Sequence, residues 1–217
     1  MKSMRRSPRW ETARRVLWLF GGCALLGLGI VFLVKTNWGP AAWDVFHLAL
    51  AERAGWTLGR ASVAVSLAII GVTLLLGGTW AVRWGTLVNT FVIGFSIDFF
   101  LRLGLPDASA LVLRLLYVAA GTLLMAFGSV LYTRAGYGAG ARDGLALVLS
   151  QKLPLTVGRI RLAMEALVCL TGWLLGGPLG PGTVLVTFGV GPTADLIYRV
   201  LGRGYLPETV RIPERAA

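Results

Sequence analysis

Six apolar runs, each long enough to cross a lipid bilayer, limit the possible folds of this chain most severely. A transmembrane helix needs about 20 predominantly apolar residues, and the charged residues fall mainly between these runs. The sequence therefore predicts an all-α, polytopic membrane protein. The runs are Val16–Val34, Gly59–Thr79, Gly85–Leu103, Ala110–Thr133, Val157–Gly176 and Gly182–Leu201.

The low content of charged residues also indicates a bilayer. Charged residues make up 14% of the 217-residue chain, whereas they make up about a quarter of a soluble domain. So few charges cannot cover the surface of a water-soluble globule of this size, and contact with lipid removes that requirement. We therefore expect the lipid bilayer to be a partner of this chain.

The net charge of +11 does not indicate a nucleic acid partner. The basic residues lie between the apolar runs and form no separate basic domain, as is typical of the loops of membrane proteins. Cys23 and Cys169 lie inside apolar runs and lack the spacing of a metal site or a disulfide framework. The chain has no P-loop, GxSxG or HExxH motif. We expect no nucleic acid partner, no enzyme activity, no cofactor and no metal site.

Two further apolar runs, Ala41–Ala51 and Ala141–Leu153, are short. Each follows a break that contains glycine, and Pro40 before the first run suits the first turn of a helix. A run of about ten to thirteen residues is typical of a half-helix or a re-entrant segment. We therefore expect each short run to enter the membrane without traversing it.

The second half of the chain repeats the first. With an offset of 99 residues, which becomes 97 after a two-residue gap, glycines and charged residues of the two halves coincide. Matches of glycine or leucine are common in an apolar chain, but five matched charged pairs indicate an internal repeat. The matches include Gly22 with Gly121, Gly29 with Gly128, Lys35 with Arg134, Gly39 with Gly138, Asp44 with Asp143, Gly59 with Gly158, Arg60 with Arg159, Gly94 with Gly191, Asp98 with Asp195 and Arg102 with Arg199.

Each repeat contains three runs of span length and one short run, so the second copy enters the membrane from the opposite side. This predicts two inverted repeats, each of three transmembrane helices plus one short re-entrant or half-helix, an architecture common in secondary transporters. We expect a basic cytoplasmic segment at 1–15, a first membrane repeat at 16–104, a second at 110–203 and a cytoplasmic tail at 204–217.

The distribution of basic residues agrees with this topology, because Lys and Arg are enriched in cytoplasmic loops. With both termini in the cytoplasm, sixteen of the 21 basic residues lie on the cytoplasmic side. If both short runs crossed instead, the repeats would be parallel, but each short run would cross with about half of the usual length. The five basic residues on the other side are Lys35, Arg53, Arg60, Arg102 and Arg114.

Polar residues near the starts of the short runs are candidates for a substrate site. They are Asp44, His47, Arg142 and Asp143. The start of a half-helix presents unpaired N–H groups and a positive dipole end near the middle of the membrane, where transported solutes and ions bind. An Asp in the first turn also simply stabilises a helix. A lone His near an Asp is either a proton relay or a half-buried polar residue at the interface.

Three pairs of opposite charge at i,i+4 spacing lie within the spans. The pairs are Asp98–Arg102, Arg161–Glu165 and Asp195–Arg199. The first and last pairs lie near the ends of spans, which favours interfacial ion pairs with the Arg side chain reaching the headgroups. The middle pair lies deeper, and the counterpart of Glu165 in the first repeat is Ser66. Glu165 is therefore either a coupling group for protons or cations or half of an internal salt bridge.

The glycine-rich breaks and the short runs together carry a family pattern. Its residues are GPAAWDVFH at Gly39–His47, GAGARDGL at Gly138–Leu145, and the pairs Gly158-Arg159, Gly176-Gly177, Gly182-Thr183 and Gly191-Pro192. In order and spacing they resemble the YczE/YyaS/YitT group of bacterial membrane proteins, over nearly the whole chain from Val16 to Leu201. The resemblance implies a multi-pass protein of the bacterial inner (plasma) membrane with a repeated domain, and it supplies no substrate.

These features favour a small-molecule secondary transporter or exporter whose substrate site lies between the repeats, at the half-helix N-termini. The alternative is a non-transporting membrane partner or assembly subunit of another membrane complex, or a homo-oligomer. Its basis is the first run, where Gly22 and Gly29 are suited to close helix packing. A channel is a third possibility, and it would conduct without saturation.

Overall fold

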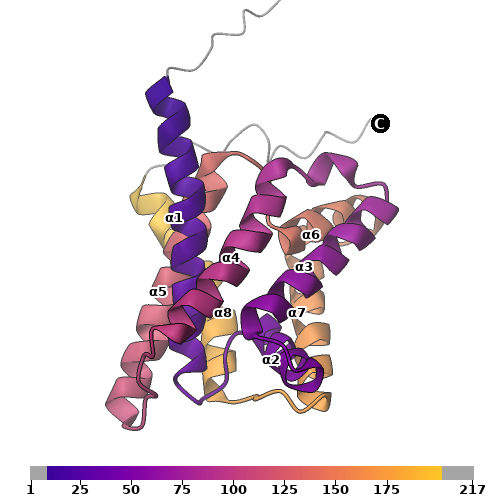
Figure 1. Cartoon of the computed structure of the whole chain (residues 1–217). Coiled ribbons are helices and arrows are strands. Elements are labelled where there is room, and N and C mark those ends of the chain that lie inside the picture. Colours follow the sequence, from indigo (N-terminus) through magenta and orange to yellow (C-terminus); the bar gives the residue numbers. More distant parts are fainter. Residues whose placement is uncertain (1–8, 202–217) are drawn as a thin grey trace, which may run out of the picture.

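The structure is a computed structural model in which residues 9–201 are described. Within this range all regular secondary structure is helical, with eight α-helices and one short 3-10 helix, η1 (Figure 1). The predicted tail 204–217 and the first eight residues lie outside the described residues. The elements are α1 (Arg9–Val34), α2 (Ala42–Ala54), α3 (Leu58–Leu75), η1 (Thr79–Ala81), α4 (Trp84–Arg102), α5 (Leu111–Ala135), α6 (Ala141–Lys152), α7 (Val157–Leu174) and α8 (Pro181–Val200).

Four of these helices, α1, α3, α4 and α5, are long and apolar enough to cross a membrane. The prediction of an all-α membrane protein is confirmed at this level. Helices α7 and α8 have 18 and 20 residues, but their sequences include charged residues, among them Arg161 and Glu165 in α7 and Asp195 in α8. That α7 and α8 also cross the membrane stays a prediction.

The two short runs form the short helices α2 and α6, with 13 and 12 residues. At about 1.5 Å per residue each is about 20 Å long, which is less than the hydrocarbon thickness of about 30 Å. Glycine marks one boundary of each helix. Gly55 ends α2 in the left-handed conformation, with a φ of 64°, and Gly140 precedes the first turn of α6.

Helix α1 begins at Arg9, seven residues before the apolar run that predicts it. Glu11 pairs with Arg15 at 2.6 Å one turn later, and the Arg14 guanidinium lies 5.0 Å from the centre of the Trp10 ring. Such local pairs stabilise a helix without apolar burial. Part of the predicted basic N-terminal segment is therefore helical.

Glycines bring the backbones of α1 and α5 into direct contact. A Cβ atom on Gly22 would lie 2.7 Å from the Gly128 carbonyl oxygen, and one on Gly29 would lie 2.8 Å from the Gly121 carbonyl oxygen. The order of these contacts shows that the two helices run antiparallel. The glycine face of α1 is therefore covered by α5, and it does not form the free docking surface that the partner-subunit hypothesis requires.

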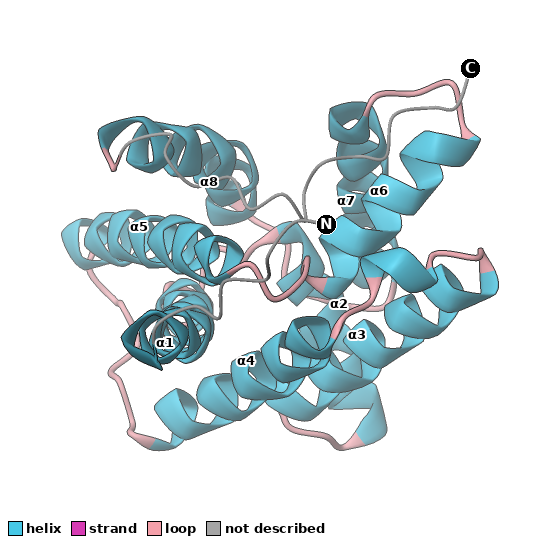
Figure 2. Cartoon of the chain, turned by 90° about the horizontal axis from the view of Figure 1, so that it is seen from above, coloured by secondary structure: helices cyan, strands magenta, loops and turns pink. Residues whose placement is uncertain are grey.

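Most other contacts between helices occur twice: when each helix is replaced by its counterpart in the other half of the chain, the second contact is obtained from the first. Helix α1 packs on α4 as α5 packs on α8, and α2 packs on α7 as α6 packs on α3. The exception is the contact between α3 and α4, since α7 and α8 do not pack together in the same way. Seen from above, α3 and α4 lie side by side, whereas α8 stands apart from α6 and α7 (Figure 2).

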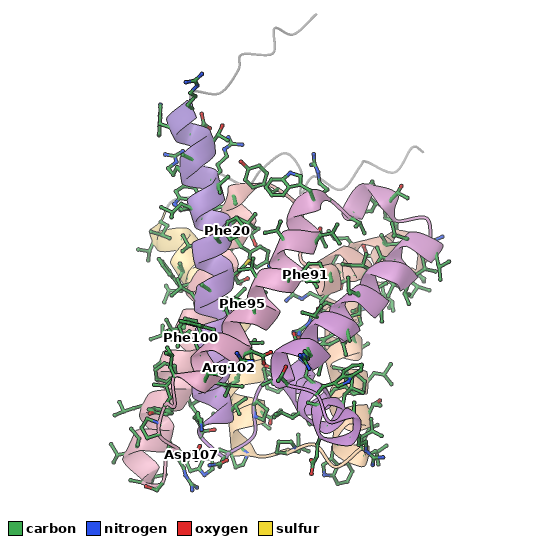
Figure 3. The ribbon with its side chains drawn as sticks, in the orientation of Figure 1. Phe20, Phe91, Phe95, Phe100, Arg102 and Asp107 are labelled. Atoms are coloured by element: carbon green, nitrogen blue, oxygen red, sulfur yellow. The ribbon has the colours of Figure 1, made fainter. Side chains whose placement is uncertain are left out.

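The outer surface of the molecule is rich in large apolar side chains. Phe91 and Phe95 project from α4 and Phe20 from α1 (Figure 3), and Phe95 is 73% exposed. Large apolar surfaces of this kind are rare on soluble monomers and are typical of contact with lipid or a partner.

Candidate functional site

A cavity of about 180 Å³ lies in the interior, and every α-helix contributes to its wall. Most of the lining residues are counterparts under the offset that relates the two halves, such as Trp43 with Arg142 and Ser62 with Arg161. The cavity therefore lies between the two repeats, at the position predicted for a substrate site.

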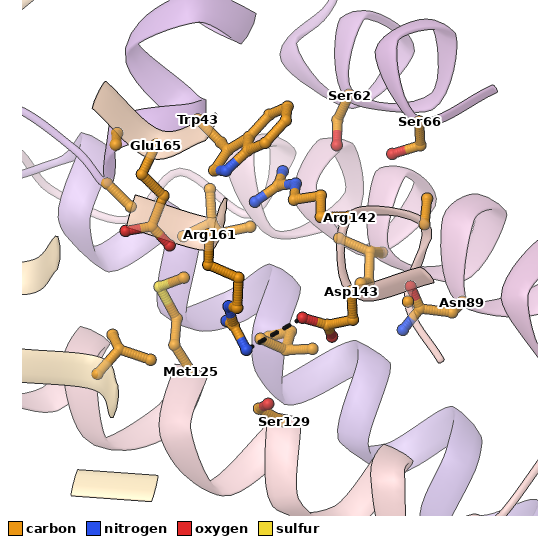
Figure 4. Close-up of a pocket in the computed structure, with 18 of the residues that line it drawn as sticks. Trp43, Ser62, Ser66, Asn89, Met125, Ser129, Arg142, Asp143, Arg161 and Glu165 are labelled. Atoms are coloured by element: carbon orange, nitrogen blue, oxygen red, sulfur yellow. Dashed lines mark ion pairs between the residues drawn. The ribbon is translucent and has the colours of Figure 1, made fainter. Parts of the chain in front are cut away.

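Arg142, in the first turn of α6, contributes a positive charge to this wall. Its guanidinium lies 4.5 Å from the centre of the Trp43 ring (Figure 4). Trp43 of α2 is the counterpart of Arg142 in the first repeat. No carboxylate of residues 9–201 forms an ion pair with Arg142. A guanidinium that stacks on an aromatic ring keeps its N–H groups at the edge, where they can bind a carboxylate or a phosphate.

Asp143, the next residue of α6, connects three helices across the cavity. Its carboxylate accepts a hydrogen bond from the Tyr132 hydroxyl of α5 at 2.8 Å and pairs with Arg161 of α7 at 3.2 Å (Figure 4). Of the two alternatives for Glu165, the salt bridge with Arg161 does not form, because Arg161 pairs with Asp143 instead. Glu165 lines the cavity and forms no ion pair with the other described residues.

Asp44 and His47 do not line the cavity, so the structure separates them from Arg142 and Asp143. Both side chains are fully buried, and Asp44 Oδ1 lies 3.1 Å from His47 Nδ1. The two aspartates differ in their partners: Asp44 pairs with His47 on its own helix, whereas Asp143 reaches Tyr132 and Arg161 on other helices. Asp44 Oδ2 and His47 Nε2 have no hydrogen-bond partner within the described part of the chain.

Asp98 also lies outside the cavity, and its predicted ion pair with Arg102 does not form. Instead, its carboxylate accepts hydrogen bonds from the Thr57 hydroxyl at 2.6 Å and from the Gly59 N–H at 2.8 Å. These groups belong to the start of α3, where unpaired N–H groups attract a carboxylate.

The corresponding ion pair in the second repeat, Asp195 with Arg199, is absent as well. Both residues are exposed in the described structure, and neither lines the cavity.

Several lining residues were not predicted as site residues. Ser62 and Ser66 of α3 face the cavity from the side opposite Glu165 (Figure 4). The repeat itself carries the signal that could have found them, since they are the counterparts of Arg161 and Glu165. Tyr132 has no such signal, because its counterpart is an apolar leucine.

Comparisons with known proteins agree with a membrane protein of this kind. Residues 13–199 match a family described as "Family of unknown function (DUF6198)". The chain is 32% identical over 203 residues to "Uncharacterized membrane protein YczE" of Bacillus subtilis (strain 168), an alignment that covers 93% of this chain and 90% of that protein. The resemblance to YczE is thereby confirmed.

Two further relatives have similar lengths. The chain is 31% identical to an "Uncharacterized protein" of Haemophilus influenzae (strain ATCC 51907 / DSM 11121 / KW20 / Rd), with 93% of this chain and 95% of that protein aligned. It is 23% identical to "Uncharacterized protein YyaS" of Bacillus subtilis (strain 168), with 88% of this chain and 95% of that protein aligned. No solved structure matches the chain.

Proposed function

The chain belongs to the family DUF6198, and we propose that it is a secondary transporter or exporter of a small polar solute. In this proposal the chain crosses the bacterial plasma membrane six times as two inverted repeats, with α2 and α6 as half-helices and both termini in the cytoplasm. The observation that supports it best is the charged cavity lined by counterpart residues of both halves. Secondary transporters bind their solutes at such an interface between repeats.

The reciprocal contacts between the halves support the inverted arrangement. Gly22 meets Gly128, and exchanging each residue for its counterpart gives the contact of Gly121 with Gly29, which is also present. Two copies related by a two-fold axis in the membrane plane would produce such contacts. The antiparallel course of α1 and α5 agrees with copies that enter from opposite sides.

The wall of the cavity indicates the chemistry of the solute. Arg142 is the one cation of the wall without a carboxylate partner among the described residues, and arginine binds carboxylates and phosphates in a bidentate manner. We therefore assign the solute a carboxylate or phosphate group and the size of a small metabolite. Glu165, on the same wall, is the candidate for coupling to a proton or a cation.

A flux assay in proteoliposomes tests this proposal. We expect saturable, protein-dependent uptake of at least one member of a panel of labelled small carboxylates and phosphorylated metabolites. Arg142→Ala removes a charge-assisted interaction, so the affinity should fall about 10- to 100-fold. The matched control is Arg102→Ala, an exposed arginine away from the cavity, which should leave the affinity unchanged. Absence of saturable uptake across a broad panel would contradict the proposal, and conductance without saturation would indicate a channel.

A further inference from the structure

The contact between α3 and α4 is fastened at one point. The Asp98 carboxylate of α4 accepts hydrogen bonds from the Thr57 hydroxyl at 2.6 Å and from the Gly59 N–H at 2.8 Å, both at the start of α3. The backbones touch beside it, since a Cβ atom on Gly59 would collide with the Gly94 carbonyl oxygen. We call this arrangement the α3–α4 latch.

The second repeat has the same four residue types at the counterpart positions, but they do not meet. The counterparts are Thr156, Gly158, Gly191 and Asp195. A Cβ atom on Gly158 or on Gly191 would have nothing within 4 Å. Asp195 is exposed, and no hydrogen bond to it is present in the described part of the chain. We call the corresponding arrangement of these four counterpart residues the α7–α8 latch. It is not formed in the structure, although all of its residue types are present.

The start of α7 has the same local hydrogen bond as the start of α3. Thr156 accepts a hydrogen bond from the Arg159 N–H at 3.4 Å, as Thr57 accepts one from the Arg60 N–H at 3.3 Å. Helix α8 carries Pro192 in its interior, where the missing N–H weakens the helix and lets it bend. An approach of α7 and α8 would therefore complete the latch without refolding either helix.

We propose that the two latches are the alternating gates of the transporter, and that Asp98 and Asp195 close them in turn. The structure has the α3–α4 latch closed and the α7–α8 latch open. In the second state α7 and α8 join through Asp195, while Asp98 releases α3. Both helix pairs border the cavity. In the proposed inverted arrangement the two latches lie toward opposite sides of the membrane, so each state opens the cavity toward one side. This inference rests on the proposed transport function.

Distances between spin labels, measured by double electron–electron resonance in nanodiscs, test the gates directly. One label pair spans each gate, and the two pairs occupy counterpart positions, all of them exposed. The background removes both native thiols. The substitutions are Arg60→Cys with Phe99→Cys for α3–α4, Arg159→Cys with Leu196→Cys for α7–α8, and Cys23→Ala with Cys169→Ala for the background.

When Asp98, Thr57 and Asp195 are left unchanged, we expect a short distance between the labels at 60 and 99 and a long distance between those at 159 and 196. Asp98→Ala removes the closed latch, so the ratio of the two states should shift about tenfold toward a long 60–99 and a short 159–196 distance. Thr57→Val removes one of the two hydrogen bonds to Asp98, together with the bond from the Arg60 N–H at the start of α3. Because the Gly59 N–H still binds Asp98, this variant should give a smaller shift in the same direction. Asp195→Ala is the matched control. It removes only the unmade latch, so it should keep the 60–99 distance short and abolish any minor short 159–196 component.

Asp98→Ala and Thr57→Val proteins that elute as single species but keep an unchanged 159–196 distance would overturn the inference. A lengthening of both distances would do the same, because the gates would then be independent. No solute is needed for this measurement. The two experiments can therefore fail separately. Absence of saturable uptake would refute transport without refuting a reciprocal change of the two distances. Absence of that reciprocal change would refute the gates without refuting transport.

Discussion

Asp143 is a single residue that fixes the start of α6 against two other helices. Asp143→Asn weakens its pairing with Arg161 and its hydrogen bond from Tyr132. The side chains of Asp143 and Arg161 are 33% and 56% exposed, so solvent screening reduces the loss to about 1 kcal/mol of unfolding free energy. Thermal unfolding in detergent should show this as a lower midpoint.

Asp107→Asn is the control for Asp143→Asn, because Asp107 also forms an ion pair, with Lys35 at 3.1 Å. The Asp107 side chain is 63% exposed, so its loss should cost less than about 0.5 kcal/mol. Equal shifts of the midpoint in the two variants would show that Asp143 does not hold the helices together.

At the scale of residues, the sequence predicted positions better than partners. Arg142 and Asp143 were found because the first turn of a half-helix is recognisable from the glycine break before it. The partners of Asp98 were missed because Thr57 and Gly59 lie 41 and 39 residues away. Spacing within one helix suggests only i,i+4 pairs, whereas the crossing of α3 and α4 decides which groups meet.

At the scale of elements, glycine accounts for where two of the predicted helices end. Gly136 and Gly176 follow the ends of α5 and α7 with φ values of 75° and 91°, a conformation that favours glycine. The start of α1 was missed because polar side-chain pairs extend that helix beyond its apolar run. Apolar periodicity carries no information about such pairs.

The α1–α5 interface gives a prediction about helix packing. Gly22→Ala places a Cβ atom 2.6 Å from the Tyr132 backbone nitrogen and 2.7 Å from the Gly128 carbonyl oxygen. Since backbone cannot move aside as a flexible side chain does, we expect a loss of about 1–3 kcal/mol of unfolding free energy. The midpoint of thermal unfolding measures it.

Gly21→Ala is the matched control on the preceding residue. A Cβ atom on Gly21 would have nothing within 4 Å, and alanine is favoured over glycine inside a helix by about 0.5–1 kcal/mol. Its midpoint should therefore stay the same or rise. If Gly22→Ala unfolded at the same temperature as Gly21→Ala, the close approach of α1 and α5 would be refuted.

At the scale of the whole molecule, the proposed inverted topology predicts that the counterpart residues Trp56 and Leu155 lie on opposite sides of the membrane. Both are exposed, at 46% and 41%. In the background without native cysteines, Trp56→Cys should react with an impermeant maleimide in intact cells. Leu155→Cys should react only after permeabilisation. Reaction of both from the same side would rule out the inverted topology.

The sequence predicts that the two halves of the chain are copies of one unit. It does not predict which of the two latches is closed. Asp98 and Asp195 stand at counterpart positions, and the same residue types stand at the other latch positions of both repeats, so a pattern of residues cannot say which latch is closed. That choice depends on how all eight helices pack at once. The site was likewise predicted as two equal half-helix starts, whereas only Arg142 and Asp143, on one of them, present their charges to the cavity.

Where α1 crosses α5, the backbone at Gly22 and Gly29 contacts the backbone of α5 directly. Backbone atoms of Gly128 and Gly121 lie at these two contacts, so a side chain added at Gly22 or Gly29 would force the helices apart. We therefore expect a large rearrangement to keep the contact of α1 with α5 and to move the other helices relative to this pair.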